Sequence, residues 1–257
     1  MAVRPTVLGH PTPEGYRLAC LYFGVGLLDR TGVLDHGFAH QTLDPIPKSA
    51  ADPGPIAALC AARAQTLAEE ARRSDKTLRL LWSGGIDSTA AATALLRALR
   101  DEPERLEFVY TAASIREYRR FHRRFIRAHP RHRRINSIHQ AFEGDALLVT
   151  GEHGDQLFGS AKAMDLPFAA LGAPWESAFP DVLRRAFGSP ERAEAALRYL
   201  EPQFAAAPIP LTTLFDLLWW MNFSLKWQAV SQRIAANAPR NRYQEIDARM
   251  RHFFRAP

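Results

Sequence analysis

Residues 78–100 contain the feature that most limits the folds open to this chain. The apolar run Leu78–Trp82 is followed at once by the turn Ser83-Gly84-Gly85 and then by an Ala- and Leu-rich stretch from Asp87 to Arg100. A short apolar run bounded by glycines indicates a buried strand, and the spacing of the apolar residues after it indicates a helix. The sequence therefore predicts a strand that passes through a glycine turn into a helix.

Strand and helix patterns alternate along residues 56–160. The elements that we expect besides the first strand and its helix are a helix at Ile56–Arg73, a strand at Leu106–Thr111, a helix at Ile115–Ala128 and a strand at Ala146–Thr150. Such alternation predicts an α/β fold in which a parallel sheet has helices on both faces. From about residue 174 onward the pattern is helical, with a helix start at Ser189-Pro190-Glu191 and a long helix at 212–236.

Residues 1–55 are expected to form a separate N-terminal appendage. They are rich in Pro and Gly, and the uncharged run Leu18–Leu28 predicts a strand or a hairpin. The sequence Asp52-Pro53-Gly54-Pro55 marks the break before the next element. Residues 56–257 then form the main domain, with its helical section beginning near residue 174.

Composition excludes several classes of protein. Hydrophobic residues make up 47% of the chain, which is ordinary for a globular protein, and the start of the sequence has no apolar core of the kind that a signal peptide needs. The longest apolar stretch, Leu217–Phe223, is too short to span a bilayer. Cys20 and Cys60 have no metal-ligand spacing. We therefore expect a soluble cytoplasmic protein that does not contact a membrane.

The hexapeptide SGGIDS, which begins at Ser83, has the chemistry of an anion cradle. Gly84 and Gly85 let backbone N–H groups point at a phosphate, and the helix that follows adds the positive end of its dipole. The hydroxyls of Ser83 and Ser88 can donate to the same phosphates. Asp87 is repelled by phosphate and suits a magnesium ion instead. The alternative is a glycine turn before a helix that Asp or Ser caps.

A second segment of this kind, GDALLVTGEHGDQLFGS, covers residues 144–160. It again predicts a strand, a tight turn and a helix. Asp87 and Asp155 then follow two different strands, and the carboxyl ends of parallel strands meet at one edge of a sheet. The two carboxylates can therefore share one metal ion. The alternative is that Glu152 and Asp155 only stabilise a helix N-terminus.

These segments resemble motifs of the ATP pyrophosphatase superfamily, also called the PP-loop superfamily. SGGIDS matches its SGGxDS loop, and residues 144–160 are similar to the acidic segment of asparagine synthetase and β-lactam synthetase. Leu214–Ile234 looks like the helix that follows in those proteins. The resemblance covers roughly residues 56–235. It implies a Rossmann-like sheet of the adenine nucleotide alpha hydrolase type, with ATP and Mg²⁺ as cofactors and cleavage of ATP to AMP and pyrophosphate.

The resemblance also assigns roles to single residues. It implies that ATP is held by Ser83, Gly84, Gly85, Asp87, Ser88 and Gly151, that Asp87 and Asp155 bind magnesium, and that Glu152 lies at the acyl-adenylate. The resembling synthetases add a lysine near the pyrophosphate from a later region. Lys162 is a candidate, but here we expect Lys226, Arg240 or Arg242, or a partner protein, to replace it.

The chain departs from the resembling synthetases at several positions. It has no glutaminase domain, and Ala2 stands where those enzymes carry a nucleophilic cysteine. An amine, free ammonia or a partner subunit must therefore supply nitrogen. His153 replaces a glycine, Gln156 replaces an acidic residue and Ser160 replaces a glycine, and the first two changes fall inside the expected site.

The function expected from these features is an ATP-dependent, amide-forming ligase of the asparagine synthetase type. It adenylates a small-molecule or peptide carboxylate and transfers the acyl group to an amine or ammonia. Two alternatives stay open: a tRNA-modifying PP-loop ATPase, and a non-catalytic nucleotide-binding subunit of a split synthetase.

The segment Arg116–Arg134 is strongly basic, with nine arginines and three histidines. In the helix expected here, Tyr118, Phe121 and Phe125 share one face. The favoured interpretation is that these aromatics are buried while the arginines face solvent. The alternatives are a stripe that contacts RNA and a surface that docks an acidic partner.

Overall fold

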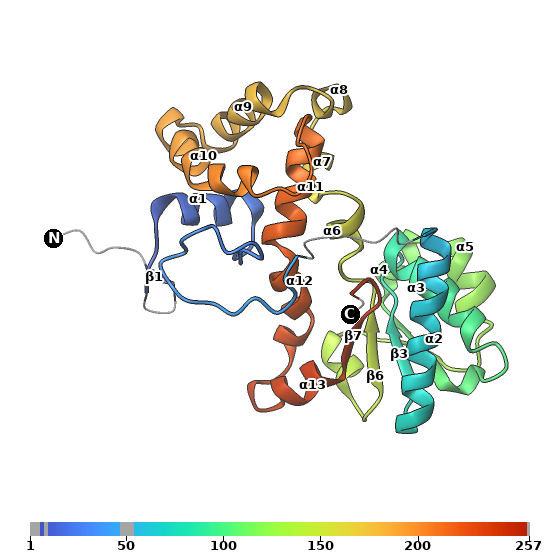
Figure 1. Cartoon of the computed structure of the whole chain (residues 1–257). Helices are drawn as coiled ribbons and strands as arrows, with labels where there is room; N and C mark the ends of the chain where they lie inside the picture. Colours follow the sequence, from blue (N-terminus) through green and yellow to red (C-terminus); the bar gives the residue numbers. More distant parts are fainter. Residues whose placement is uncertain (1–5, 8–9, 47–53, 256–257) are drawn as a thin grey trace. The chain divides into compact units, whose positions relative to one another are not determined.

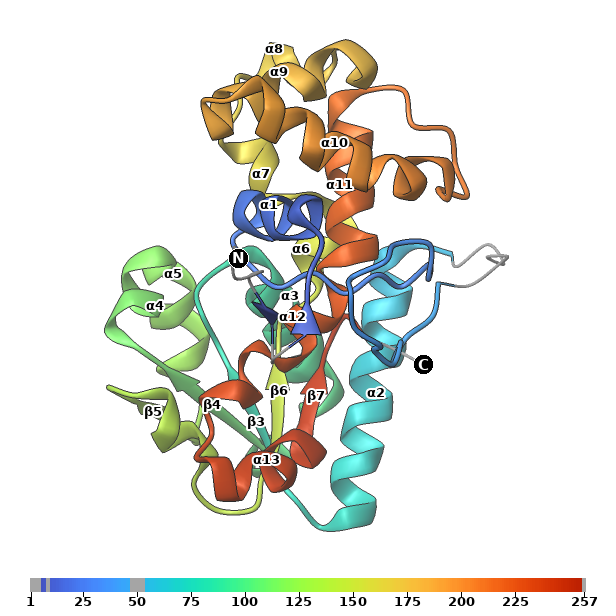
Figure 2. The same ribbon diagram turned by 90° about the vertical axis from the view of Figure 1, so that its left-hand side faces the viewer.

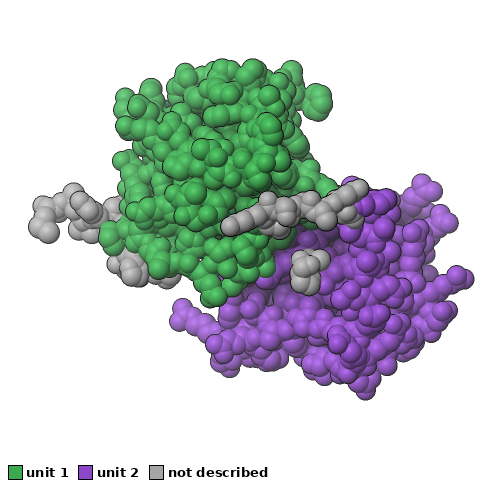
Figure 3. Space-filling view, viewed as in Figure 1, with its two compact units in different colours: residues 1–49, 155–230 green, residues 50–154, 231–257 purple. Residues whose placement is uncertain are grey.

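The computed structural model describes residues 6–7, 10–46 and 54–255, which form two compact units. Figure 1 traces the chain and Figure 3 colours the units. Unit 1 comprises residues 1–49 and 155–230, and unit 2 comprises residues 50–154 and 231–257. Each unit is thus assembled from two stretches that lie far apart in the sequence. Ala2, which was singled out above, lies outside the described residues.

Unit 2 is built on a five-stranded parallel sheet. Its strands are β3 (Leu78–Leu81), β4 (Leu106–Tyr110), β5 (His132–Arg134), β6 (Leu147–Thr150) and β7 (Met250–His252). They lie side by side in the order β5-β4-β3-β6-β7 (Figure 2). Along the chain, β4 and β5 are added on one side of β3, and β6 and β7 are then added on its other side. The strand order therefore reverses between β3 and β6.

Helices cover both faces of this sheet. The helical segments of unit 2 are α2 (Ile56–Ser74), α3 (Ile86–Ala98), η1 (Pro103–Arg105), α4 (Ala112–Glu117), α5 (Arg119–Phe121), η2 (His122–Ile126), η3 (Ile138–Phe142), η4 (Ala235–Asn237), η5 (Arg240–Arg242) and α13 (Tyr243–Arg249). Successive strand side chains point to opposite faces. Leu147 and Val149 of β6 accordingly pack with α2 and α3, while Leu148 packs with α13. The expected α/β class and the parallel sheet between helices are confirmed.

Within unit 2, two strands and the helix at 115–128 differ from the sequence-based expectation. β5 and β7 were not expected, because three-residue strands with polar side chains have no apolar run to mark them. The single helix expected at 115–128 is broken at Tyr118, whose backbone angles (φ −139°, ψ 70°) are not helical. The last part, η2, is a π-helix. These changes shift which side chains face the sheet.

Unit 1 is mainly helical (Figure 1). It contains the strands β1 (Thr6–Val7) and β2 (His10–Pro11) and the helices α1 (Glu14–Phe23), α7 (Ala161–Met164), α8 (Phe168–Leu171), α9 (Trp175–Phe187), α10 (Pro190–Ala205) and α11 (Leu214–Leu225). The boundary with unit 2 falls within α6 (Gly154–Phe158) and within α12 (Trp227–Arg233). One apolar cluster joins α1 to α9, α10 and α11. Ser189 caps α10, as its sequence predicted.

The strand or hairpin expected at Leu18–Leu28 is wrong, because the first part of this run is helix α1. An uncharged run does not by itself separate strand from helix. Here Tyr16, Ala19 and Tyr22 repeat at helical spacing and are buried. The helix ends at Gly24, which adopts φ 69°, a conformation that glycine allows without strain.

The long helix expected at 212–236 is two helices. Thr213 and Asp216 form a capping box at the start of α11, and α11 ends at Leu225 with Lys226 as its C-cap residue. The interpretation of its aromatics as core residues is confirmed for Trp220 and Trp227, which are buried. The guanidinium of Arg30 lies 4.6 Å from the ring centre of Phe223 and 4.4 Å from that of Trp227.

A row of charges crosses one face of the sheet in unit 2. The Glu107 carboxylate accepts hydrogen bonds from Arg79 Nε at 2.6 Å and from Arg133 Nε at 2.9 Å. Arg79 also donates to Ala141 O at 2.8 Å, so this row fastens η3 to the strands. Burial opposes ionisation of Glu107, but the two arginines outweigh it and hold the pKa of this carboxyl below its ordinary value.

Replacing Glu107 by Gln is therefore expected to destabilise the protein by about 3 kcal/mol at pH 7, because it leaves buried Arg79 without its countercharge. A carboxyl whose pKa is lowered by folding stabilises the protein above its unfolded pKa, and this stabilisation is lost as the pH falls through the folded pKa. The difference between wild type and variant should therefore shrink below about pH 4. Urea unfolding at several pH values measures this. Glu102→Gln, at an exposed ion pair with Arg72, is the control; equal losses in both variants would contradict the prediction.

Candidate active site at the carboxyl edge of the sheet

The two sequence motifs follow neighbouring strands at the reversal point of the sheet. The SGGIDS loop begins directly after β3, and Gly151 and Glu152 come directly after β6. β3 and β6 are hydrogen-bonded parallel neighbours, so both loops lie at the same carboxyl edge. Open parallel sheets bind ligands in the crevice at such a reversal point.

The SGGIDS loop is held in shape by its own serines. The hydroxyls of Ser83 and Ser88 lie 2.9 Å apart, and Ser88 Oγ also donates to Gly85 O at 3.1 Å. Gly84 adopts φ +94°, and a Cβ there would lie 2.5 Å from Ser114 O of α4. The first glycine is therefore required both by its backbone conformation and by the close approach of α4.

Helix α3 begins in this loop without a side chain to cap it. Its N-cap residue is Gly85, which has no side chain that could accept a hydrogen bond from the first turn. The first N–H groups of a helix have no partner within the helix, and with the dipole they favour an anion. The alternative interpretation, a helix capped by Asp or Ser, is therefore wrong for this turn.

The loop after β6 lies directly against the start of α3. A Cβ added to Gly151 would lie 2.6 Å from Ser88 N, and one added to Gly154 would lie 2.0–2.4 Å from the carboxyl atoms of Asp87. No real side chain fits at such distances. The two motifs are therefore in contact through their glycines, and Gly154 belongs to the site although the sequence analysis did not select it.

Between these glycines, His153 is held in an unusual conformation. Its φ is +77°, in the left-handed region that favours glycine, and its ring is buried. His153 Nε2 lies 2.8 Å from Ser231 Oγ, while His252 of β7 lies 2.7 Å from Thr150 Oγ1 and 2.8 Å from Ser231 O. This network fixes the loop to the last strand of the sheet.

Glu152 is engaged by an arginine that the sequence analysis missed. Both carboxylate oxygens accept hydrogen bonds from Arg233 Nη2, at 2.9 and 2.7 Å. The Glu152 side chain is only 13% exposed, whereas that of Arg233 is 64% exposed. Because 81 positions separate the two residues, no local pattern in the sequence indicates this pair.

A second acidic residue reaches the SGGIDS loop from α4. Glu117 Oε1 would lie 3.3 Å from a Cβ on Gly85, and Glu117 Cβ would lie 2.9 Å from one on Gly84. Asp87, Glu117 and Glu152 thus each follow the carboxyl end of a strand of unit 2. A carboxylate near a phosphate repels it unless a cation accompanies the pair.

The described residues do not form an all-protein metal cage. Among the described residues no three His, Cys, Asp or Glu side chains gather in a way that could hold a metal ion. Magnesium commonly uses one or two carboxylates and takes its other ligands from phosphates and water. Asp87, seated against Gly154, provides one such carboxylate in unit 2.

Asp155 and Lys226 belong to unit 1. The Asp155 side chain is exposed, while its backbone oxygen accepts a hydrogen bond from Asn222 Nδ2 at 2.9 Å. Gln156 is buried, with its amide nitrogen 3.4 Å from Asn222 Oδ1. An amide at position 156 therefore lets α6 pack against α11 without burying a charge.

Arg242 and Lys162, two other candidates for the basic group expected near the pyrophosphate, each contact an acidic side chain of their own unit. Arg242 forms an ion pair with Glu245 at 2.9 Å and donates to Phe142 O at 3.4 Å. Phe142 precedes β6 and Arg242 precedes β7, so Arg242 lies at the amino edge of the sheet, opposite the SGGIDS loop. It is not the basic group of this site. Lys162 Nζ in unit 1 lies 3.8 Å from Asp165 Oδ2.

Comparison of the chain with protein-family models, with curated proteins and with solved structures finds no match. Within the described part of the chain, no helix has both the length and the apolar character needed to cross a membrane.

The backbone of His153 supports a prediction that does not depend on function. His153→Gly and His153→Ala both remove the contact with Ser231, but only glycine relieves the left-handed conformation. The Gly variant should therefore be more stable than the Ala variant by about 1 kcal/mol. Chemical denaturation measures the difference. The control pair is Asp75→Gly and Asp75→Ala, at an exposed site with φ 50°. If the Ala variant at position 153 is as stable as the Gly variant, the assigned conformation of His153 is contradicted.

Proposed function

We propose that this protein is an ATP-dependent, AMP-forming ligase that activates a carboxylate as its adenylate and passes the acyl group to an amine or ammonia. The observation that carries this proposal is the contact of Gly151 and Gly154 with Ser88 and Asp87 at the reversal point of the sheet. This contact brings the SGGIDS loop and the loop after β6 together, which supports their acting as one site. The strand order β5-β4-β3-β6-β7, with its reversal between β3 and β6, also supports a doubly wound fold of the Rossmann-like type in this proposal.

In this proposal the β- and γ-phosphates, which leave as pyrophosphate, lie at the uncapped start of α3. The backbone N–H groups of the SGGIDS loop and of the first turn of α3 hold the anion. The hydroxyls of Ser83 and Ser88, which contact each other within the loop, would donate to the same phosphates. Asp87 would hold a magnesium ion, with Asp155 as the second ligand that the resemblance implies. The ion would neutralise charge on the departing pyrophosphate.

Glu152 is proposed to orient the attacking nitrogen. A carboxylate beside the adenylate can accept a hydrogen bond from an incoming amine and then take its proton. Arg233 holds both oxygens of Glu152 in one orientation, which keeps the carboxylate aligned before substrate arrives. Because the Arg233 side chain is largely exposed, it can also meet the negative charge of an arriving carboxylate substrate.

The first test is the position at which ATP is cleaved. Purified protein with magnesium, ATP, a panel of carboxylic acids and hydroxylamine as a small amine should release pyrophosphate and form AMP and hydroxamates. Asp87→Asn should lower this rate by a factor on the order of 10² or more, because it removes a metal ligand. Gly154→Ala should do the same, because its methyl group displaces the Asp87 carboxyl.

The controls for this test are Asp145→Asn, at an exposed residue before β6, and Gly159→Ala, where an added Cβ meets nothing within 4 Å. Both should keep wild-type turnover. Release of ADP and orthophosphate instead of AMP and pyrophosphate would refute the proposed reaction, and so would full activity of Asp87→Asn.

The role of Glu152 is tested separately. Glu152→Gln should leave ATP binding unchanged and slow hydroxamate formation by about 10²–10⁴-fold, which is the usual range for a proton-transfer group. Isothermal titration with a non-hydrolysable ATP analogue and a product assay separate the two effects. If the variant instead loses nucleotide affinity while keeping its rate, Glu152 serves only the structure of the loop.

A further inference from the structure

Six arginines between residues 116 and 127 form an unusual surface on α4, α5 and η2. We call this set the arginine surface; its members are Arg116, Arg119, Arg120, Arg123, Arg124 and Arg127. All six side chains are exposed, and none forms an ion pair with, or donates a hydrogen bond to, any other residue that the structure describes. Other arginines of the same unit are paired: Arg72, Arg105 and Arg133 each lie within 3.3 Å of a carboxylate oxygen.

The charge of the arginine surface is not balanced nearby in the sequence. Glu117 is the only acidic residue between positions 112 and 134, and its side chain turns toward Gly84 and Gly85. Six cations on two or three helical turns repel one another at low ionic strength. A polyanion that binds them would remove this repulsion and release its own counterions.

Exposed aromatic rings lie among these arginines. Tyr118 and Phe125 are each 42% exposed, and their rings lie 5.7 and 4.9 Å from the buried ring of Phe121. Phe121 in turn stacks on Trp82 at 5.9 Å. The expectation that all three aromatics are buried is therefore wrong. The break at Tyr118 and the π-helical turn leave the outer two rings in solvent, held in place by the central one.

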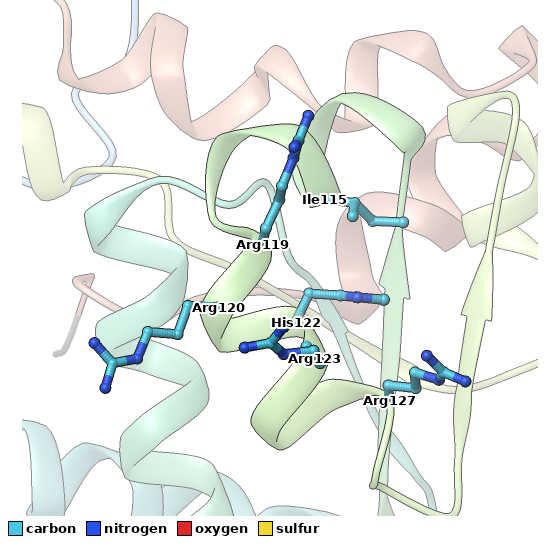
Figure 4. Close-up of a pocket in the computed structure, with 6 residues that line it drawn as sticks. All are labelled: Ile115, Arg119, Arg120, His122, Arg123 and Arg127. Carbon is cyan, nitrogen blue, oxygen red and sulfur yellow. The ribbon is translucent and has the colours of Figure 1, made fainter.

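Four of the six arginines line a hollow on this surface and do not converge on one point. Its volume is about 460 Å³, and it is lined by Ile115, Arg119, Arg120, His122, Arg123 and Arg127. Figure 4 shows the side chains of Arg119, Arg120 and Arg127 extending in different directions. Guanidinium groups spread in this way suit successive phosphates of a nucleic-acid strand better than a single small anion. Arginine also forks onto phosphate and stacks on bases more readily than lysine does.

We propose that the arginine surface binds single-stranded nucleic acid, with arginines on successive phosphates and unpaired bases stacked on Tyr118 and Phe125. Positive grooves with exposed aromatics are the usual means of binding single strands, because every base offers a stacking face. An acidic protein would satisfy the arginines but would leave the two rings without a specific partner. This inference does not rest on the proposed ligase activity.

The binding test uses fluorescence anisotropy with labelled twelve-nucleotide RNA and DNA of one base, and with a polyglutamate peptide, over a range of salt concentrations. The test variant is Arg119→Glu/Arg120→Glu/Arg123→Glu. The control, Arg73→Glu/Arg97→Glu/Arg100→Glu, makes the same change in charge at exposed residues of α2 and α3 and just after α3. Each lost phosphate contact lowers the salt slope by about 0.7, so the test variant should lose about 2 from the slope and roughly 100-fold in affinity. The control should stay within about threefold.

Stacking is tested with Tyr118→Ala and Phe125→Ala, which keep every arginine. Each should weaken binding about tenfold without changing the salt slope, since stacking involves no counterions. Because both side chains are exposed, these variants should keep the melting temperature of the wild type. They keep the proposal testable even if the triple variant fails to fold.

The outcomes distinguish RNA, single-stranded nucleic acid in general and an acidic protein as the ligand of the arginine surface. Preference for the RNA oligomer identifies RNA as the ligand, and equal binding of RNA and DNA identifies single strands in general. Tighter binding of polyglutamate, lost in the test variant, would overturn the proposal in favour of an acidic protein partner. Equal weakening by the control variant, or the absence of binding to either oligomer at low salt, would also overturn it.

Discussion

Contact between two backbones at the edge of the sheet determines the arrangement of the candidate site. Gly151 and Gly154 let the loop after β6 touch the first turn of α3, where a single methyl group would overlap Ser88 or Asp87. Neither loop could bring its polar groups to the other if these positions carried side chains. The sheet supplies the framework, because it places the ends of β3 and β6 side by side. The glycines then set how closely the two motifs approach.

The surroundings of this contact favour rigidity. His153 occupies a strained backbone conformation that persists only because its buried ring is tied to Ser231, which in turn lies against His252 of β7. The loop is thereby connected to a strand about a hundred residues further along the chain. Glu152 is likewise fixed by Arg233. In the proposed reaction, a site aligned in this way would need less reorganisation when charge develops.

The sequence predicts the elements whose signals are local. β3, β4 and β6 are apolar runs next to turns, and α2 and α3 have apolar residues at helical spacing, so neighbouring residues suffice to identify them. β5 and β7 are short and polar and exist because a paired neighbour satisfies their backbone. The motifs likewise select Asp87 and Glu152 as candidates, whereas Arg233 and Glu117 reach the candidate site only through tertiary contacts. The association of residues 1–49 with residues 155–230 is long-range for the same reason.

The position of β7 also bears on how the molecule is made. β6, which contains Leu148, leaves the ribosome roughly a hundred residues before α13 and β7. β7 then pairs with β6, and α13 covers the face of the sheet on which Leu148 lies. At ordinary rates of translation this interval lasts roughly 5–20 s. During it, β6 presents an unpaired edge and an uncovered apolar row, which are the features that promote aggregation. Unit 1 receives its last residues before unit 2 does. Nascent chains of this protein are therefore expected to depend on chaperones until β7 is in place.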